Sequence, residues 1–394
     1  MVLAAVALLV LAGRGGEAAL AGGDRLDQAR ALRAIRDRNF FLGLVWSWGF
    51  LLLLLNAGAS AWLHTRISRR LVPRWLSDSV YFALLLLAVE VVAWPLRYRA
   101  EYQVARRFGL NIQTPPAWLW DQVLTAAINV AIGVVAVLVL YGLMRRFPRR
   151  WLLIAAVLGI GASIGGSFLW PVVIDPLYNE YRPVTNPEIL ARVEHLSRVT
   201  GVPIGAVLRV DMGRRTTAAN AWVTGLWGTR RIVIGDTLLE RYSPAEIEAV
   251  LAHELGHVVH HDVWWGTVAL AAAQAAALFV QARPARWLLR LYGGRWRISG
   301  LADPAGLPLL LLLLGVAFTV AMPAVNAASR WREAAADRYA LKVTSEPAAL
   351  ESFFEAVGRQ NLQDPNPPHW HVWLFMSHPP LAERIEMVRR ASQQ

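Results

Sequence analysis

The sequence predicts a mainly α-helical polytopic membrane protein with a small α+β portion outside the lipid, and three observations carry this prediction. Of the 394 residues, 56% are apolar and only 17% are charged. The apolar residues gather into six continuous blocks of about twenty residues, the length that an α-helix needs to cross a bilayer. The segments between and after these blocks are polar and mixed in composition, as expected of parts that fold in water.

Four of the blocks lie in the first half of the chain and two in the second. They cover residues 40–63, 79–95, 121–143, 151–174, 263–281 and 307–326. An amphipathic, Arg-rich segment (24–39) precedes the first block, and a polar loop of about 25 residues after Arg97 separates the second block from the third. An Arg-rich loop (282–300) is expected to join the last two blocks into a membrane hairpin.

The first 22 residues allow two interpretations. Their apolar stretch and Ala19-Leu20-Ala21 resemble a signal peptide with a cleavage site, but a signal peptide normally begins with basic residues, which are missing here. The alternative, which we favour, is a retained and imperfect first span. The chain therefore has six or seven predicted transmembrane helices.

The formal charge of +12 does not indicate nucleic-acid binding, because the basic residues are almost all arginines in short loops between apolar blocks. Arginine in such places is typical of contact with lipid headgroups, so the expected partner is the lipid bilayer. The chain has no cysteine, so any metal ion must be held by histidines and carboxylates.

The water-exposed segments contain clear helix and strand signals. Residues 187–200 are expected to form a helix, with Asn186 as its cap and Gly201 at its end. The runs VLRVDM and AWVTGLWGTRRIVIG are typical of strands, including one β-hairpin. Four portions follow in order: membrane helices (1–174), a first water-exposed segment (175–262), the membrane hairpin (263–326) and a C-terminal water-exposed segment (327–394).

A metal-binding pattern, HELGH, occupies residues 253–257. It lies on a predicted helix that opens with a capping box, in which Ser243 is the cap and Glu246 is the reciprocal partner. Because residues four apart share one face of a helix, His253 and His257 can bind the same ion, and Glu254 beside them can act as the base that takes a proton from water. The alternative is a helix at the membrane edge whose histidines bind no metal.

A third ligand is needed, since hydrolytic zinc sites hold the ion with three protein side chains and leave one position for water. Glu333 is the candidate, because the membrane hairpin returns its helix to the side from which HELGH left. Asp337, one turn further along, can accept the free N–H of a ligating imidazole. The alternative is that Glu333 and Asp337 belong to a solvated helical face.

In HELGH, SRWREAAAD and the membrane hairpin between them, the sequence resembles the type I CAAX prenyl endopeptidase family of membrane zinc metalloproteases. The family pattern S-R-x-x-E-x-x-A-D is matched from Ser329 to Asp337. Further matching segments are FGLNIQT, IDPLYNEYRPV, RRTTAANAWVTGLWGTRRIVIGDTLL and WLFMSHPPLAERI, so the resemblance extends over most of the chain.

The resemblance implies one Zn²⁺ per chain on His253, His257 and Glu333, with Glu254 as general base and Asp337 behind a ligand. It also implies that Asn220 and Ala221 lie on an edge strand that pairs with extended substrate. His378 matches a family histidine that stabilises the oxyanion, although on its own a histidine before Pro-Pro is more typical of a turn. The family fold is a ring of helices around a water-filled chamber, which would accommodate a polar group such as Glu90 within a span.

The sequence thus predicts a membrane-embedded zinc endopeptidase that acts on a peptide or protein. The substrate is expected to carry a prenylated C-terminal tail, or, alternatively, to be a membrane protein cleaved for quality control without a prenyl requirement. A non-catalytic membrane scaffold and a transporter are the competing classes. The resemblance places the site at the cytoplasmic face, in the plasma (inner) membrane if the protein is prokaryotic, whereas arginine counts in the loops do not decide the orientation.

Overall fold

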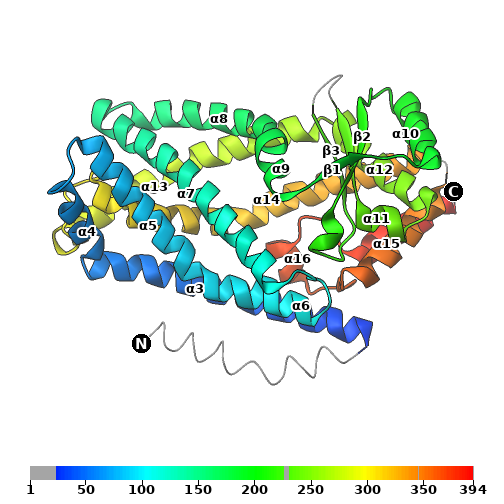
Figure 1. The fold of residues 1–394 in the computed structure, drawn as a ribbon, viewed down its shortest axis with the longest axis horizontal. Helices are drawn as coiled ribbons and strands as arrows, with labels where there is room; N and C mark the ends of the chain where they lie inside the picture. The colour runs from blue at the N-terminus through cyan, green and yellow to red at the C-terminus, as the bar shows by residue number, and fades with distance from the viewer. Residues whose placement is uncertain (1–23, 226–229, 345, 394) are drawn as a thin grey trace.

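The computed structural model describes residues 24–225, 230–344 and 346–393, and most of them are helical (Figure 1). Within these residues, six helical stretches are long and apolar enough to cross a membrane, which confirms the six predicted spans. The candidate span within residues 1–22 lies outside the described part of the chain. The six stretches are Arg25–Asn56, Arg74–Arg107, Pro115–Arg146, Trp151–Tyr178, Asp262–Trp296 and Pro304–Val343.

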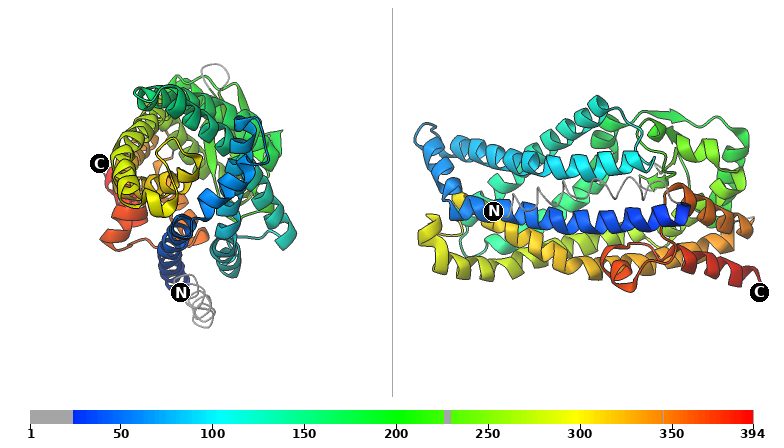
Figure 2. Two further views of the ribbon diagram at one scale, coloured as in Figure 1. Left: turned by 90° about the vertical axis from the view of Figure 1, so that its left-hand side faces the viewer. Right: turned by 90° about the horizontal axis from the view of Figure 1, so that it is seen from below.

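These long helices stand side by side in a ring when the molecule is viewed end on (Figure 2, left). Helix α3 (Arg25–Asn56) packs against α5 (Arg74–Arg97) and α14 (Leu307–Val343), and α5 packs against α7 (Pro115–Arg146). On the other side, α13 (Asp262–Trp296) packs against α8 (Trp151–Leu169) and α14. Large apolar side chains of the spans are exposed on the protein, for example Val135 at 62% and Val320 at 75%, as expected of surfaces that meet lipid.

Several helix ends differ from the predictions made from hydropathy. The span predicted to end at residue 63 ends at Asn56, because Gly58 has a left-handed backbone (φ 64°) and a separate helix, α4 (Ala59–Ser68), follows. The polar loop predicted after Arg97 is mostly helical: η1 (Tyr98–Val104) and α6 (Ala105–Arg107) continue α5.

The prediction of an Arg-rich loop at residues 282–300 was wrong over most of its length. Helix α13 continues to Trp296 with Pro284 inside it, because Ala, Leu and Arg favour a helix even where the pattern is no longer apolar. The expected boundaries after residues 174 and 326 fall inside continuous helical stretches, Trp151–Tyr178 and α14. Polarity changes at these points, but nothing there interrupts a helix.

One four-stranded sheet lies at the end of the molecule away from α4 (Figure 1). Its order is β1 (Tyr181–Pro183), β2 (Ala206–Val210), β4 (Arg231–Gly235) and β3 (Ala221–Thr224). The predicted hairpin corresponds to β3 and β4, which pair antiparallel, while β2 pairs parallel with β4. Strand β1 was not predicted, because three residues ending in proline carry no alternation signal.

Helices pack around this sheet and form a hydrophobic core with it, called here the sheet core. They are α10 (Pro187–Thr200), α11 (Asp236–Arg241), α12 (Pro244–Val259), α15 (Pro347–Gln360) and α17 (Leu381–Ser392). The predicted cap at Asn186 and the capping box of Ser243 and Glu246 are both present. These caps fix where α10 and α12 begin, and therefore where the HELGH residues lie.

Candidate active site

Helices α12 and α14 cross at very short range, and this crossing builds the site. Gly256 of α12 makes it possible, because a Cβ atom there would lie 3.2 Å from Cα of Ala336 and 3.3 Å from the ring of Tyr339. Ala336 is fully buried at the contact. The glycine of HELGH therefore lets the backbone of α14 approach the two histidines.

The crossing brings His253, His257 and Glu333 together. The Nε2 atoms of His253 and His257 are 3.2 Å apart. Glu333 Oε2 is 3.2 Å from Nε2 of His253, and Glu333 Oε1 is 3.6 Å from Nε2 of His257. The return of Glu333 to the HELGH helix, expected from the hairpin, is therefore what the structure shows.

These separations suit a tetrahedral metal ion. Ligands about 2.05 Å from a tetrahedral zinc ion are about 3.3 Å from one another. This is close to the 3.2 Å between the two imidazole nitrogens, and each of these nitrogens lies 3.2 or 3.6 Å from a different oxygen of Glu333. Glu333 Oε2 is also buried without a well-formed hydrogen bond to any described residue, which is costly unless another group binds it. Two imidazoles and one carboxylate are the usual ligands of hydrolytic zinc.

Each histidine of the cluster is held from behind by a carboxylate. Asp337 Oδ1 lies 2.8 Å from Nδ1 of His253, and Asp262 Oδ2 lies 2.7 Å from Nδ1 of His257. The carboxylates direct both Nε2 atoms toward the same point, because a donor Nδ1–H leaves Nε2 with a free lone pair. Burial opposes a charge on His253, but its carboxylate neighbours outweigh burial and raise the pKa of His253 to about 9.

Asp262 and Arg384 contribute to this arrangement and were not predicted. Asp262 is five residues after His257, a spacing that does not share a helix face, and it reaches back only because His261 takes a left-handed conformation (φ 59°) between α12 and α13. Arg384 donates to both carboxylate oxygens of Asp337, at 2.8 and 2.6 Å. Its only signal was its place within the segment SHPPLAERI.

Glu254 lies next to the cluster and is held by none of its neighbours. Its carboxylate forms no hydrogen bond or ion pair with any residue that the structure describes. Burial raises the pKa of Glu254, and the nearby histidines oppose this effect. A carboxylate that is free and more basic than usual is suited to accept a proton from water.

His378 reaches the cluster from the C-terminal segment. Its Nε2 is 3.2 Å from Glu333 Oε2, its Nδ1 is 2.9 Å from the hydroxyl of Ser377, and its side chain is 52% exposed. Burial of part of the ring lowers the pKa of His378, against the pull of Glu333. The imidazole is therefore both close to the cluster and open to an incoming molecule.

The predicted substrate strand lies beside the same space. Ala221 is the first residue of β3, which is an edge strand of the sheet, and Asn220 precedes it. A cavity of about 670 Å³ is lined by both Asn220 and His378, and it has the size of an ordinary ligand site. Asn220 is exposed, whereas the side chain of Ala221 is buried in the sheet core.

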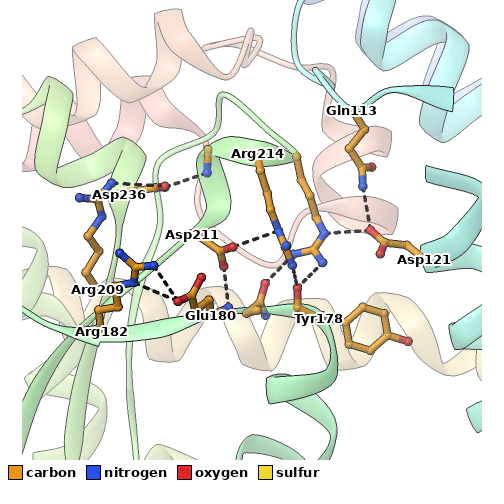
Figure 3. Close-up of polar contacts among 12 residues, drawn as sticks. Gln113, Asp121, Tyr178, Glu180, Arg182, Arg209, Asp211, Arg214 and Asp236 are labelled. Atoms are coloured by element: carbon orange, nitrogen blue, oxygen red, sulfur yellow. Dashed lines mark hydrogen bonds and ion pairs between the residues drawn. The ribbon is translucent and has the colours of Figure 1, made fainter. Parts of the chain in front are cut away.

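A polar network fixes the segment before β3 to the membrane helices (Figure 3). Arg215 donates to Asp121 of α7 at 2.8 Å, to Asn179 at 2.6 Å and to the carbonyl of Tyr178. Gln113 donates to the same Asp121 oxygen at 2.7 Å. The edge strand is thus held relative to α7 and to the end of the Trp151–Tyr178 stretch.

Comparison with known proteins gives the family. Residues 183–392, just over half of the chain, match the sequence model of Peptidase family M48. The chain belongs to the M48 family. The membrane part of this M48 metalloprotease, residues 25–180, matches a second model, described as CAAX prenyl protease N-terminal, five membrane helices.

Named relatives of this M48 metalloprotease differ in how much of the chain they cover. The Uncharacterized metalloprotease YhfN of Bacillus subtilis is 32% identical over 89% of this chain and 82% of its own length. CAAX prenyl protease 1 of Saccharomyces cerevisiae is 29% identical over 53% of this chain and 45% of its own. A Protease HtpX homolog of Thermococcus sibiricus is 33% identical over 52% of this chain and 74% of its own.

Among solved structures, the crystal structure of S. mikatae Ste24p has the same fold. Its TM-score is 0.79, with 97% of this chain and 98% of that chain covered at 22% sequence identity. The predicted fold class is therefore confirmed: membrane helices around a chamber, with a small α+β portion. The predicted family is confirmed as well, and the M48 protein is a multi-pass membrane metalloprotease.

Proposed function

We propose that this metalloprotease is a zinc-dependent endopeptidase whose ion is held by His253, His257 and Glu333. The observation that carries the proposal is the convergence of these three side chains from α12 and α14: one ligand atom from each lies within 4.8 Å of the other two, and the two imidazole Nε2 atoms are 3.2 Å apart, as in a tetrahedral zinc site. Asp337 and Asp262 orient the two imidazoles from behind. The negative charge that this donor set supplies favours a divalent cation over an empty site.

When bound, the zinc ion supplies Lewis acidity that makes water a nucleophile near neutral pH. Glu254 takes the proton from the attacking water and passes it to the amine that leaves. Its lack of other partners and its raised pKa support this role, because the carboxylate can bind water and hold the proton long enough to transfer it. His378 donates from Nε2 toward the developing oxyanion, and its exposed ring beside Glu333 supports that position.

The substrate would lie extended along β3. Asn220 and Ala221 would offer backbone groups to it, as edge strands commonly do in peptide recognition. The shared cavity of Asn220 and His378 supports this placement, since a peptide paired with β3 would pass the catalytic groups. The network around Arg215 would then keep the strand at a fixed distance from the chamber.

Two substrate classes are compatible with this mechanism. A prenylated C-terminal tail is favoured by the relatives named CAAX prenyl protease 1, and a membrane protein cut without a prenyl requirement is the alternative. We place the site at the cytoplasmic face, in the plasma membrane if the protein is prokaryotic. A non-catalytic scaffold does not require Glu254 or a complete set of metal ligands. A transporter would need charged residues within several of its apolar spans, and the charged residue found there is chiefly Glu90, which is bound by Arg97 at 2.7 Å and by Asn129 at 3.0 Å.

The test is a Glu254→Gln variant measured for both zinc content and cleavage. It should keep one zinc ion per chain and lose cleavage by about 10²- to 10⁴-fold, because only the base is removed. Glu240→Gln, on α11 and paired with Arg209 at 2.9 Å, is the matched control and should cleave normally. Unchanged turnover in Glu254→Gln, or equal cleavage with and without a chelator, would contradict the mechanism.

The substrate class is tested with one peptide made with and without a farnesyl group. Faster cleavage of the farnesylated peptide supports a prenylated C-terminal tail as the substrate. Equal cleavage of both peptides supports the alternative, a membrane protein cleaved for quality control.

A further inference from the structure

Two cavities meet at helix α3. The first is the cavity of about 670 Å³ that reaches His378. The second, about 630 Å³, lies between α3 and the helical stretch of α5 and η1. Arg36 and Phe40, one turn apart on α3, line both, so the cavity beside His378 and the cavity between two membrane-spanning helices adjoin at these two side chains.

Arg36 is a cation without an acceptor among the described residues at this junction. Its side chain is exposed to the cavities and forms no hydrogen bond or ion pair with any described residue. A guanidinium has five N–H donors in a planar fork and is always charged, so it is the side chain best suited to bind a carboxylate.

The acidic side chains of the first cavity do not fill this need, because other donors already occupy them. Asp37 accepts from His371 at 2.8 Å and from Arg33 at 3.2 Å. Asp364 accepts from Arg33 at 2.9 Å and from a backbone N–H at 3.2 Å. All four carboxylate oxygens are thus engaged, and they hold α3 to the C-terminal segment that carries His378.

The charged groups of the second cavity leave Arg36 free as well. Arg97 is bound to Glu90 at 2.7 Å, and Glu101, the carboxylate among the described residues that line this cavity, forms no ion pair with Arg36. The rest of the wall is largely apolar, with Phe40, Leu44, Ala93, Leu96, Ala100 and Ala105. An apolar trough that ends at one unpaired guanidinium is complementary to a chain with apolar side chains and a single negative group.

We propose that Arg36 binds a carboxylate of the peptide substrate and so fixes how far the chain advances past His378. This inference rests on the proposed endopeptidase function, since the ligand is the peptide that is cut. The carboxylate comes from the C-terminus of the substrate or from an acidic side chain near it. Arg36 is therefore a specificity-determining residue and takes no part in the proton transfers.

The test compares three peptides of one sequence: a free C-terminal acid, a C-terminal amide, and an amide with aspartate as its last residue. Their binding is measured by fluorescence anisotropy to zinc-loaded Glu254→Gln protein in detergent, which does not depend on turnover. The acid should bind about 10- to 100-fold more tightly than the amide, as expected of charge-assisted hydrogen bonds. The aspartate peptide shows whether an acidic side chain serves as well as the terminus.

Arg36→Gln in the same background should abolish the preference, and Arg36→Lys should retain part of it. Arg30→Gln is the matched control, because Arg30 is exposed on the same helix and lines neither cavity. The proposal is overturned if the unchanged protein binds acid and amide equally, as it would if lipid phosphate were the ligand of Arg36. It is also overturned if Arg36→Gln keeps the preference or Arg30→Gln loses it. Failure of the endopeptidase function would appear separately, as cleavage that survives in Glu254→Gln.

Discussion

Replacing Asp337 by asparagine tests how the metal site is supported. Asp337 is 1% exposed and accepts from Arg384 at 2.8 and 2.6 Å, while its Oδ1 also lies 2.8 Å from His253 Nδ1. Asparagine keeps the shape but has only one acceptor oxygen. Whichever way the amide turns, its NH₂ group faces a donor, either Arg384 Nε or the pair formed by Arg384 Nη2 and His253 Nδ1.

The cost can be estimated from these contacts. Loss of a second-sphere carboxylate typically weakens metal binding by 10- to 100-fold, which corresponds to about 1.4–2.7 kcal/mol. We therefore expect Asp337→Asn to bind zinc 10- to 100-fold more weakly, and to be less stable by about 2 kcal/mol because a charged hydrogen-bond pair becomes neutral and partly unmatched.

Zinc affinity is measured by competition with a chromophoric chelator, and activity is measured at saturating zinc. Glu351→Gln is the control, since it breaks a carboxylate–arginine pair with Arg389 (2.7 Å) away from the site. Zinc affinity of Asp337→Asn within about twofold of the unchanged protein would refute the supporting role, because a second-sphere carboxylate normally contributes at least tenfold.

Three further outcomes are expected. Gly256→Ala should lower zinc affinity and melting temperature, because the added Cβ meets the backbone of Ala336 at 3.2 Å and moves α14 by a few tenths of an ångström; Gly142→Ala, with nothing within 4 Å, should not. In metal-free protein, the folded-state pKa of His253 (about 9) exceeds its ordinary value of 6.5, so its stabilising charge is complete below pH 6.5 and is lost as the pH rises through 9. The melting temperature of the metal-free protein should therefore decrease as the pH rises from 6.5 to 9. Zinc affinity should increase over the same interval, because the competing proton leaves His253. A melting temperature that does not depend on pH would contradict this. His378→Ala should lower kcat by about 10²- to 10³-fold with little change in KM, and a change in KM alone would contradict an oxyanion role.

The sequence allowed prediction of those parts of the fold that local chemistry determines. The spans followed from hydropathy, and the starts of α10 and α12 followed from their caps. The meeting of HELGH with Glu333 followed from counting membrane crossings: two spans between them return the chain to the same side. Helix ends such as Trp296 were missed, because composition changes gradually where the backbone continues without interruption.

The long-range contacts of the site were beyond such reasoning. Asp262 reaches His257 only through the left-handed turn at His261, and nothing in a histidine requires that conformation. The bond from Arg384 to Asp337 joins residues 47 positions apart, in helices whose packing no periodicity specifies. The free donors of Arg36 could not be inferred either, since an Arg-rich amphipathic segment gives no information on which arginine lacks a partner.

Helix α14 places a mechanical demand on the membrane part of the protein. It runs 37 residues without a break, with Pro323 between the apolar half and Glu333. Those two residues are ten apart, about 15 Å along the axis, so a tilt of one degree about Pro323 displaces Glu333 by about 0.3 Å. Metal–ligand distances tolerate only about 0.2 Å. The bilayer and the ring of helices must therefore hold the orientation of α14 to within about a degree. Lipids that change the tilt of this helix would modulate the activity of the enzyme.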